Sequence, residues 1–261
     1  MNAVFKNMSA LNLVFAFLGG VLLLFIIAPL AGMYLNTSVS SLNDAVGSEE
    51  VRNSVWLSLW TAMVGTILFS FLAIPLAYLL ARKNFPLKSI VNGIIDIPII
   101  IPHSAAGIAV LGIITRDSFL GKTGELFGIK FIGNPAGIIL AMAFVSIPFL
   151  INAARDGFAA VPERLEKIAL TLGASPIRVF FTISLPLAWR SVLSGFILMW
   201  ARGMSEFGAV IIVAYNPQTA PVLIFERFTS YGLKYSVPAA VVFVSVCLII
   251  FIVLRLIKKR N

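Results

Sequence analysis

The sequence predicts an all-α membrane protein with six transmembrane helices, and three observations support this fold class. Of its 261 residues 59% are hydrophobic, more than the core of a water-soluble protein requires, and only 12% are charged. The apolar residues form six stretches, each long enough to cross about 30 Å of hydrocarbon as a helix. Only short polar segments separate these stretches. We therefore treat residues 1–261 as a single transmembrane domain.

The six expected spans follow one another along the whole chain. They are Leu11–Leu35, Val55–Ala81, Ser89–Ile114, Pro135–Ala154, Ser191–Tyr215 and Val237–Ile257. The first has features of a cleaved signal peptide, because it follows Lys6 and ends in small residues around Ala31 and Gly32. Its apolar run exceeds the roughly 7–15 residues of a signal-peptide core, and it contains Pro29. We expect a retained helix and a mature chain that starts at Met1.

The distribution of lysine and arginine predicts the orientation of these helices. With the N-terminus inside, the inner segments carry 13 basic residues and the outer segments carry 6. The inner residues are Lys6, Arg82, Lys83, Lys88, Arg155, Arg164, Lys167, Arg178, Arg190, Arg255, Lys258, Lys259 and Arg260, and the outer ones are Arg52, Arg116, Lys122, Lys130, Arg227 and Lys234. Cytoplasmic loops are enriched in Lys and Arg, so both termini are expected in the cytoplasm. Topology and anionic lipids account for much of the net charge of +9, which is therefore no argument for nucleic acid.

Several kinds of chemistry find little support. Cys247 is the single cysteine, which excludes a disulfide framework and a cysteine-based metal site. One histidine and no Ser-His or metal-ligand constellation leave an intramembrane hydrolase almost nothing to work with. The string Gly121-Lys122-Thr123 lacks the earlier glycine of a P-loop, because Arg116 stands there, and we expect a turn. The outer loops, 36–53, 116–134 and 216–236, are each about twenty residues, too short for a ligand-capturing domain of about 100 residues.

The cytoplasmic segment between the fourth and fifth spans, about residues 155–190, predicts two short helices at an angle. Pro162 suits a first helical turn, and Glu163 is favourable at that end. The apolar residues at i, i+3, i+4 and i+7 on one face are Leu165, Ile168, Ala169 and Leu172. Gly173 offers a positive-φ stop, Ser175 is a candidate N-cap with Pro176 behind it, and the second helix is expected to break at Pro186.

On physical grounds alone these two helices could lie on the bilayer surface as amphipathic connectors. Their spacing favours another interpretation. Gly173, then Ile183 after nine residues, then Leu185-Pro186, with Ala169 before them, resembles the EAA loop of ABC-importer permeases, E-A-A-x3-G-x9-I-x-L-P. Lys167 stands where that family usually has Glu, Glu166 is one place early, and Ile168 replaces the first Ala.

The resemblance implies a type I ABC-importer permease fold, in which the first short helix docks on a separate cytoplasmic ATPase as a coupling helix. An amphipathic helix can be held in a protein groove by such regularly spaced anchors. It further implies two copies of this chain, two ATPases that bind ATP and Mg, an extracytoplasmic binding protein, and no cofactor in this chain. The candidate coupling residues are Leu165, Glu166, Lys167, Ile168, Ala169, Gly173, Ser175, Pro176, Ile183, Leu185 and Pro186.

Polar groups in the third and fifth spans are candidates for a transport pathway, because polar groups are costly at membrane depth. Pro98 and Pro102 are expected to kink the third span. Asp96 either lines the pathway or caps the broken helix, and His103 is either a pathway residue or a hydrogen-bonded core residue. Arg202 and Glu206 are spaced as an intrahelical ion pair. The full set is Asp96, Pro98, Pro102, His103, Ser104, Arg202, Ser205, Glu206, Phe207 and Gly208.

The same stretches carry a finer resemblance. DIPIIIPHSAAGIA (Asp96 to Ala109), ARGMSEFGAVIIVAYNP (Ala201 to Pro217) and RKNFPLKS (Arg82 to Ser89) are similar to permeases for molybdate, tungstate and sulfate, and most similar to the archaeal-type molybdate/tungstate branch. The implied setting is the plasma membrane of a prokaryote. Sulfate or thiosulfate is the alternative cargo, and a secondary transporter or channel is a further alternative. For a dianion pathway we expect Glu206 to be paired or to face away from the lumen.

Overall fold

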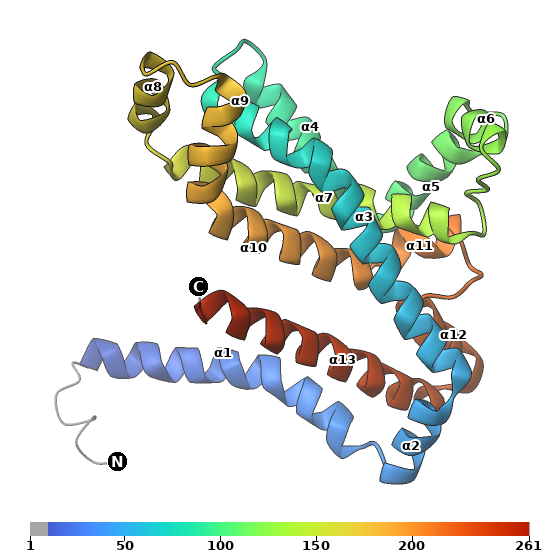
Figure 1. The fold of residues 1–261 in the computed structure, drawn as a ribbon. Helices are drawn as coiled ribbons and strands as arrows, with labels where there is room; N and C mark the ends of the chain where they lie inside the picture. The colour runs from blue at the N-terminus through green and yellow to red at the C-terminus, as the bar shows by residue number, and fades with distance from the viewer. Residues whose placement is uncertain (1–9, 261) are drawn as a thin grey trace.

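The computed structural model describes residues 10–260, with side chains to residue 253, and every regular element in that range is a helix (Figure 1). Lys6 and the side chains of Arg255 and residues 258–260, which entered the charge count, lie outside the described part. The helices are α1 (Ala10–Leu35), α2 (Val39–Gly47), α3 (Glu49–Arg82), α4 (Lys88–Ile100), α5 (His103–Ile114), α6 (Phe119–Leu126), α7 (Pro135–Ala160), α8 (Glu163–Thr171), α9 (Pro176–Val179), α10 (Leu185–Met204), α11 (Gly208–Val213), α12 (Ala220–Tyr231) and α13 (Leu233–Arg260). A π-helical segment, Phe180–Ser184, joins α9 to α10.

Five of the described helices are long and apolar enough to cross a membrane, and a sixth span exists if the bent pair α4 and α5 counts as one. The expected first, second, fourth and sixth spans lie on α1, α3, α7 and α13. α3 begins earlier than the expected Val55, because Ser48 caps it by accepting a hydrogen bond from the N–H of Val51. Glu49 and Glu50 in its first turn also favour a helix start there.

The expected third span is broken into two helices. α4 ends at Ile100, α5 begins at His103, and their axes differ by 111°. Proline disfavours the helical conformation of the residue before it, and Ile101 before Pro102 is accordingly extended, with φ −71° and ψ 147°. Pro102 also has no N–H to continue the helix. The proline pair therefore ends one helix and starts another, a stronger effect than the expected kink.

The expected fifth span is displaced, and the predicted break at Pro186 is wrong. The helix runs without interruption from Pro176 to Met204. In the π-helical segment the N–H of Leu185 bonds to the carbonyl of Phe180, five residues back, so the chain enters α10 through a wider turn. Pro186 then occupies the first turn of α10, where its missing N–H is tolerated. The span ends at Met204 and a separate short helix, α11, follows.

The string Gly121-Lys122-Thr123 lies within α6, so the predicted turn there is also wrong. Ser118 caps this helix, because its Oγ accepts a hydrogen bond of 3.0 Å from the N–H of Gly121. A residue that caps three positions before the string thus turns a loop-like sequence into the first turn of a helix.

The central bundle consists of α3, α7 and α10. Its largest buried side chains include Leu80 on α3, Met142 and Phe158 on α7 and Met199 on α10. Small residues allow α7 and α10 to approach closely: a Cβ atom added to Gly195 would lie 2.9 Å from the Cβ of Ala153. The bundle is the rigid frame on which both candidate regions described below are mounted.

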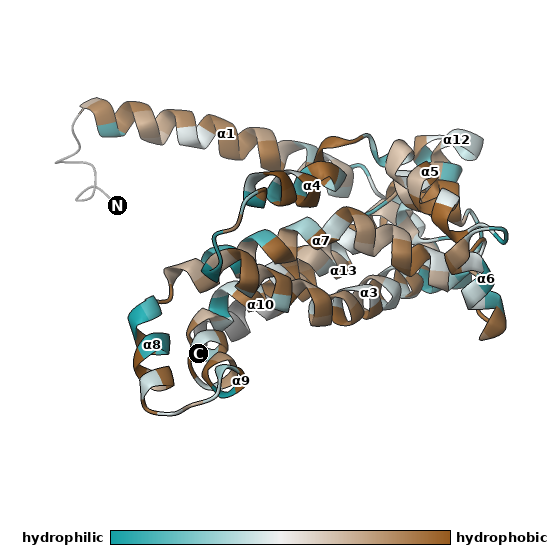
Figure 2. Cartoon of the chain, turned by 90° about the horizontal axis from the view of Figure 1, so that it is seen from above, coloured by the Kyte–Doolittle hydropathy of each residue, from teal (hydrophilic) through white to brown (hydrophobic). Residues whose placement is uncertain are grey.

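The two ends of the molecule differ in which elements they carry. α8, α9, the start of α1 and the end of α13 lie at one end, and α2, α6 and α12 lie at the other (Figures 1 and 2). Figure 2 shows hydrophilic segments on α8 and α6 and predominantly hydrophobic colour along α1. α1 has no buried residue, and it is linked to α13 by a hydrogen bond of 2.7 Å between Tyr34 Oη and Ser245 Oγ.

Candidate functional site

A glycine turn follows α8, as the sequence predicts. Gly173 has φ 88°, in the left-handed region that disfavours residues with a Cβ atom. The N–H groups of Gly173 and Ala174 donate to the carbonyls of Leu170 and Ala169, each at 3.0 Å. These bonds satisfy carbonyls that have no partner within a helix end. The prediction of a positive φ at Gly173 is confirmed.

Caps define the beginnings of both short helices. Ser175 accepts a hydrogen bond of 3.3 Å from the N–H of Arg178, and Pro176 is the first residue of α9, which confirms the predicted N-cap. Pro162 is the cap residue before α8, so it stands just outside the first turn in which the sequence placed it. The second helix continues into α10, and only α8 is an independent short helix.

α8 turns its apolar side chains outward and buries a carboxylate. Leu165, Ile168 and Leu172 are 42%, 45% and 83% exposed, whereas Glu166 is 7% exposed. A helix that packs its apolar face against its own chain has the opposite arrangement. The apolar face predicted from the spacing is therefore exposed on this chain.

Four groups from distant segments surround Glu166. Arg82, at the end of α3, donates from Nε to both carboxylate oxygens at 2.9 and 3.0 Å and from Nη2 to Oε1 at 2.7 Å. Ser184 Oγ donates to Oε1 at 2.7 Å, and Tyr78 Oη donates to Oε2 at 3.3 Å. Arg82 Nη2 also donates to the carbonyl of Val161 at 3.0 Å. The network joins α8 to α3, to the end of α7 and to the π-helical segment.

The surroundings of Glu166 act on its pKa in opposite directions. Burial is the largest single influence and raises the pKa, but hydrogen bonds from Arg82 and Ser184 and the charge of Arg82 lower it further, so that the net pKa lies below the ordinary 4.5. The carboxylate is therefore ionised at neutral pH. On the same helix Glu163 pairs with Lys167 at 2.9 Å, but these side chains are 54% and 73% exposed. Exposed pairs contribute little to stability.

Sequence reasoning missed the partners of Glu166. Arg82 was counted only as a basic loop residue, and Tyr78 and Ser184 were not considered. Tyr78 and Arg82 are four residues apart at the end of a transmembrane helix, which places them on one face. That spacing is the one available signal, and it does not identify a partner 84 positions away in the chain.

The two broken spans meet at their breaks. A Cβ atom added to Gly107 of α5 would lie 2.8 Å from the carbonyl oxygen of Ala209 in α11. One added to Gly208 would lie 2.7 Å from the Cβ of His103. Both distances are shorter than real side chains allow, so glycine is required for this approach. The start of α5, with Pro102, His103 and the exposed Ser104, therefore lies against the start of α11.

Arg202, Glu206 and His103 form an ionic cluster at these breaks. Arg202 Nη1 lies 2.8 Å from Glu206 Oε2, which confirms the predicted pair, and Arg202 Nη2 lies 2.7 Å from His103 Nε2. Glu206 Oε1 accepts a hydrogen bond of 2.9 Å from the N–H of Ala209. Glu206 is 1% exposed, whereas the side chain of His103 is 42% exposed. His103 is thus hydrogen-bonded but is not a core residue.

The remaining predicted pathway residues have separate environments. Asp96 accepts a hydrogen bond of 2.7 Å from Asn152 Nδ2 of α7. It does not cap the broken helix, because α4 continues to Ile100, so that alternative is wrong. Pro98 is buried, Ser205 is exposed, and the half-buried Phe207 packs against Phe225 with ring centroids 4.8 Å apart.

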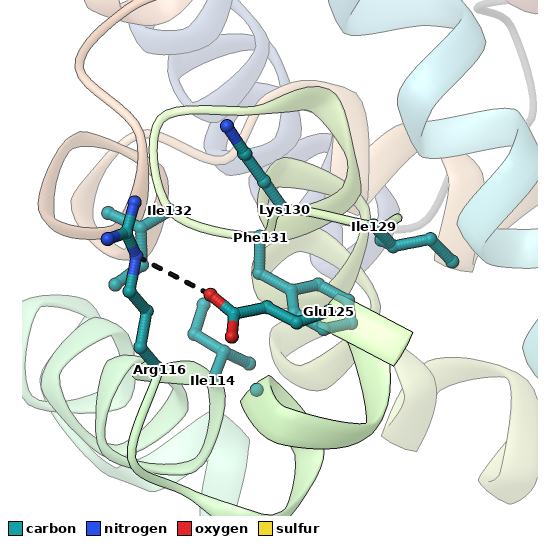
Figure 3. Close-up of a pocket in the computed structure, with 8 residues that line it drawn as sticks. Ile114, Arg116, Glu125, Ile129, Lys130, Phe131 and Ile132 are labelled. Atoms are coloured by element: carbon teal, nitrogen blue, oxygen red, sulfur yellow. Dashed lines mark ion pairs between the residues drawn. The ribbon is translucent and has the colours of Figure 1, made fainter. Parts of the chain in front are cut away.

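A cavity of about 230 Å³ lies between α5 and α7 at the end that carries α6 (Figure 3). Arg116 Nε and Glu125 Oε1 face each other there at 3.6 Å, with side chains 79% and 50% exposed. Ile114, Lys130 and Phe131 also line it, and none of the predicted site residues does. In the described part of the chain, no three His, Cys, Asp or Glu side chains gather in a group that could hold a metal ion.

Comparison with known proteins adds three findings. Residues 73–261 match the family described as binding-protein-dependent transport system inner membrane component. The molybdate/tungstate transport system permease protein WtpB of Thermococcus kodakarensis is 46% identical over 95% of this chain and 96% of its own. The probable sulfate transport system permease protein cysT of Chlorokybus atmophyticus is 32% identical over 83% of this chain and 77% of its own. A solved bacterial ABC transporter involved in the import of alginate has the same fold, with a TM-score of 0.72 and 15% identity over 95% of both chains.

Proposed function

Because the chain belongs to the family of binding-protein-dependent transport system inner membrane components, we propose that it is the permease subunit of an ATP-driven importer for molybdate or tungstate. The observation that carries the proposal is the similarity to WtpB over nearly the full length of both chains. The motif Asp96 to Ala109 supports the same branch of the family. The chemistry of ATP belongs in this proposal to a partner, and the permease supplies the pathway.

Sulfate or thiosulfate is the second candidate cargo. These ions have the same tetrahedral shape and negative charge as molybdate, so a pathway alone distinguishes them poorly. The relative named for sulfate transport is 32% identical, against 46% for the relative named for molybdate and tungstate, and it covers less of this chain. This difference favours molybdate and tungstate.

For the topology, we infer that α4 and α5 form one broken span, which makes six, and that both termini are cytoplasmic. The excess of basic residues in the inner segments supports this orientation. The start of α1 and the end of α13 lie at the same end of the molecule as α8 (Figure 1). The coupling segment, residues 155–190, then faces the cytoplasm of a prokaryotic cell.

We further propose that two copies of the chain pack about a two-fold axis, each with its α8 docked on one of two ATPases that bind ATP and Mg. The exposed Leu165, Ile168 and Leu172 are spaced as anchors for a groove on that partner. A separate extracytoplasmic protein delivers the oxyanion. Gly173, Ser175 and the continuous helix through Ile183, Leu185 and Pro186 hold α8 at its angle.

The proposed mechanism is alternating access. ATP binding draws the two α8 helices together and turns the pathway outward, and hydrolysis and release return it inward. The broken spans around His103 and Arg202 are the proposed pathway lining. The pairing of Glu206 with Arg202 supports an anionic cargo, because it leaves no uncompensated carboxylate there. Asp96 is hydrogen-bonded to Asn152, so it too has a partner.

Reconstitution in vesicles with the cognate ATPase and binding protein tests the proposal. We expect molybdate and tungstate to stimulate ATP turnover and to be taken up, and sulfate and thiosulfate to have little effect. Stimulation by sulfate alone would move the assignment to the second candidate. Uptake driven by an ion gradient in vesicles that contain only this chain would replace the importer with a secondary transporter.

A further inference from the structure

Glu166 differs from every other residue of α8 because it is the only buried one. Its two carboxylate oxygens accept hydrogen bonds from Arg82, Ser184 and Tyr78, all within this chain. The apolar residues that a partner could bind, such as Leu165 and Ile168, are the exposed ones. Glu166 is therefore unsuited to be a docking contact, although it lies on the proposed docking helix.

The pair of Arg82 and Glu166 is built for a fixed geometry. The two side chains are 7% and 9% exposed, and the closest nitrogen and oxygen atoms are 2.7 Å apart. A planar guanidinium that donates several hydrogen bonds to one carboxylate is more directional and stronger than an exposed ion pair. The pair thus resists relative movement of the two helices better than the exposed pair of Glu163 and Lys167 could.

This pair is also the point at which α8 meets the transmembrane bundle. Its other attachments are the backbone connections at Val161 and at the Gly173 turn. Arg82 belongs to α3 and also donates to the carbonyl of Val161 at the end of α7, while Ser184 precedes α10. A displacement of α8 therefore acts on all three helices of the central bundle through one carboxylate.

We propose that the Arg82–Glu166 pair, supported by Ser184, is the junction that transfers movement of α8 to the transmembrane bundle. Glu166 acts as a positioning residue, and it contacts neither the ATPase nor the transported anion. This inference rests on the proposed function, because it assigns a path for the movement that ATP binding imposes on α8. Loss of the pair should separate ATP turnover from anion uptake.

The test compares matched variants in vesicles that contain the permease, its ATPase and its binding protein. Glu166→Gln removes the charge and keeps the shape, and Arg82→Lys keeps the charge but cannot donate the parallel hydrogen bonds of a guanidinium. Glu163→Gln is the control, because it makes the same change on the same helix in an exposed pair. ATP turnover and molybdate uptake are measured in the same samples, and their ratio is the readout.

We expect Glu166→Gln and Arg82→Lys to bind the ATPase and to hydrolyse ATP while molybdate uptake per ATP falls about 5- to 150-fold, the range typical of coupling between two sites. Glu163→Gln should retain the ratio of the unaltered protein. If the single variants fail to fold, the double variant Arg82→Gln/Glu166→Gln leaves no unpaired charge and should fold while remaining uncoupled.

The outcomes separate this inference from the proposed function. If the unaltered protein shows no oxyanion-stimulated ATP turnover, the proposed function fails. If the unaltered protein is coupled and Glu166→Gln is equally coupled, the function stands and the junction is overturned. The junction is also overturned if Glu163→Gln loses coupling to the same extent, or if the junction variants no longer bind the ATPase, since the pair would then shape the docking surface.

Discussion

Two buried glutamates in this protein are both paired with arginine, but they hold different parts of it together. Glu206 pairs with Arg202, four residues earlier, and accepts the N–H of Ala209, three residues later. Glu166 pairs with Arg82, 84 positions away, and its other donors come from α3 and the π-helical segment. The first arrangement closes the end of a broken helix locally. The second connects separate helices.

The difference teaches which buried charges can be read from a sequence. An i, i+4 pair follows from helical spacing, so Arg202–Glu206 was predicted before the structure was known. A buried carboxylate without a local partner needs donors from other elements, because an unpaired charge is costly away from water. Glu166 has no such local partner, and its position can be understood only after α3, α7 and α10 are packed.

Removal of each arginine should reveal the contrast most strongly. Arg82→Ala leaves the 9% exposed carboxylate of Glu166 without its main partner, and we expect the free energy of unfolding to fall by about 3–5 kcal/mol. Arg202→Ala should cost less, because Glu206 keeps its backbone donor and no distant helix is released. Denaturant unfolding of the purified variants measures both. An equal or larger loss for Arg202→Ala would contradict the distinction.

The contact that supports the Glu206 region can be tested with two glycines of α5. Gly107→Ala brings a Cβ atom within 2.8 Å of the backbone of Ala209, and we expect a loss of about 1–3 kcal/mol in unfolding free energy. Gly112→Ala is the control, because no atom lies within 4 Å of the added Cβ. That change should be neutral or stabilising by up to about 1 kcal/mol. Equal losses at both positions would argue against a close approach of α5 and α11.

The Glu166 region depends on the orientation of α8, which the Gly173 turn sets. Gly173→Val places a β-branched residue at φ 88°, at a cost of about 1–3 kcal/mol that we expect to distort the turn. Anion uptake per ATP should fall as a result. Gly173→Asn is the control, since asparagine tolerates the left-handed region better. Unchanged uptake in Gly173→Val would remove the assigned role of this turn.

The smallest effect is expected from pH. The pKa of Glu166 is lower in the folded protein than its ordinary 4.5, so its stabilising contribution is complete above that value and is lost as the pH falls through the folded pKa. The difference in melting temperature between the unaltered protein and Glu166→Gln should therefore be constant near neutral pH and shrink below about pH 4.5. A difference that stays constant on acidification would show that the charge of Glu166 is not what stabilises α8.

The sequence by itself determined the features that depend on neighbours within one or two helical turns. The long apolar helices, the Gly173 turn, the Ser175 cap and the Arg202–Glu206 pair were all predicted correctly. The break near Pro102 was predicted too, although as a kink. Local sterics, capping and helical spacing are sufficient for such features, because every participant lies in the same short segment.

Only the tertiary structure decided the features whose partners are distant in the chain. It determined that the helix continues past Pro186, that the two broken spans meet at Gly107 and Gly208, and that Glu166 turns inward to Arg82. Each of these requires two segments to approach until their atoms touch, and packing of the bundle sets that distance. Residue type and spacing state which groups need a partner, whereas the packed helices determine which partner is within reach.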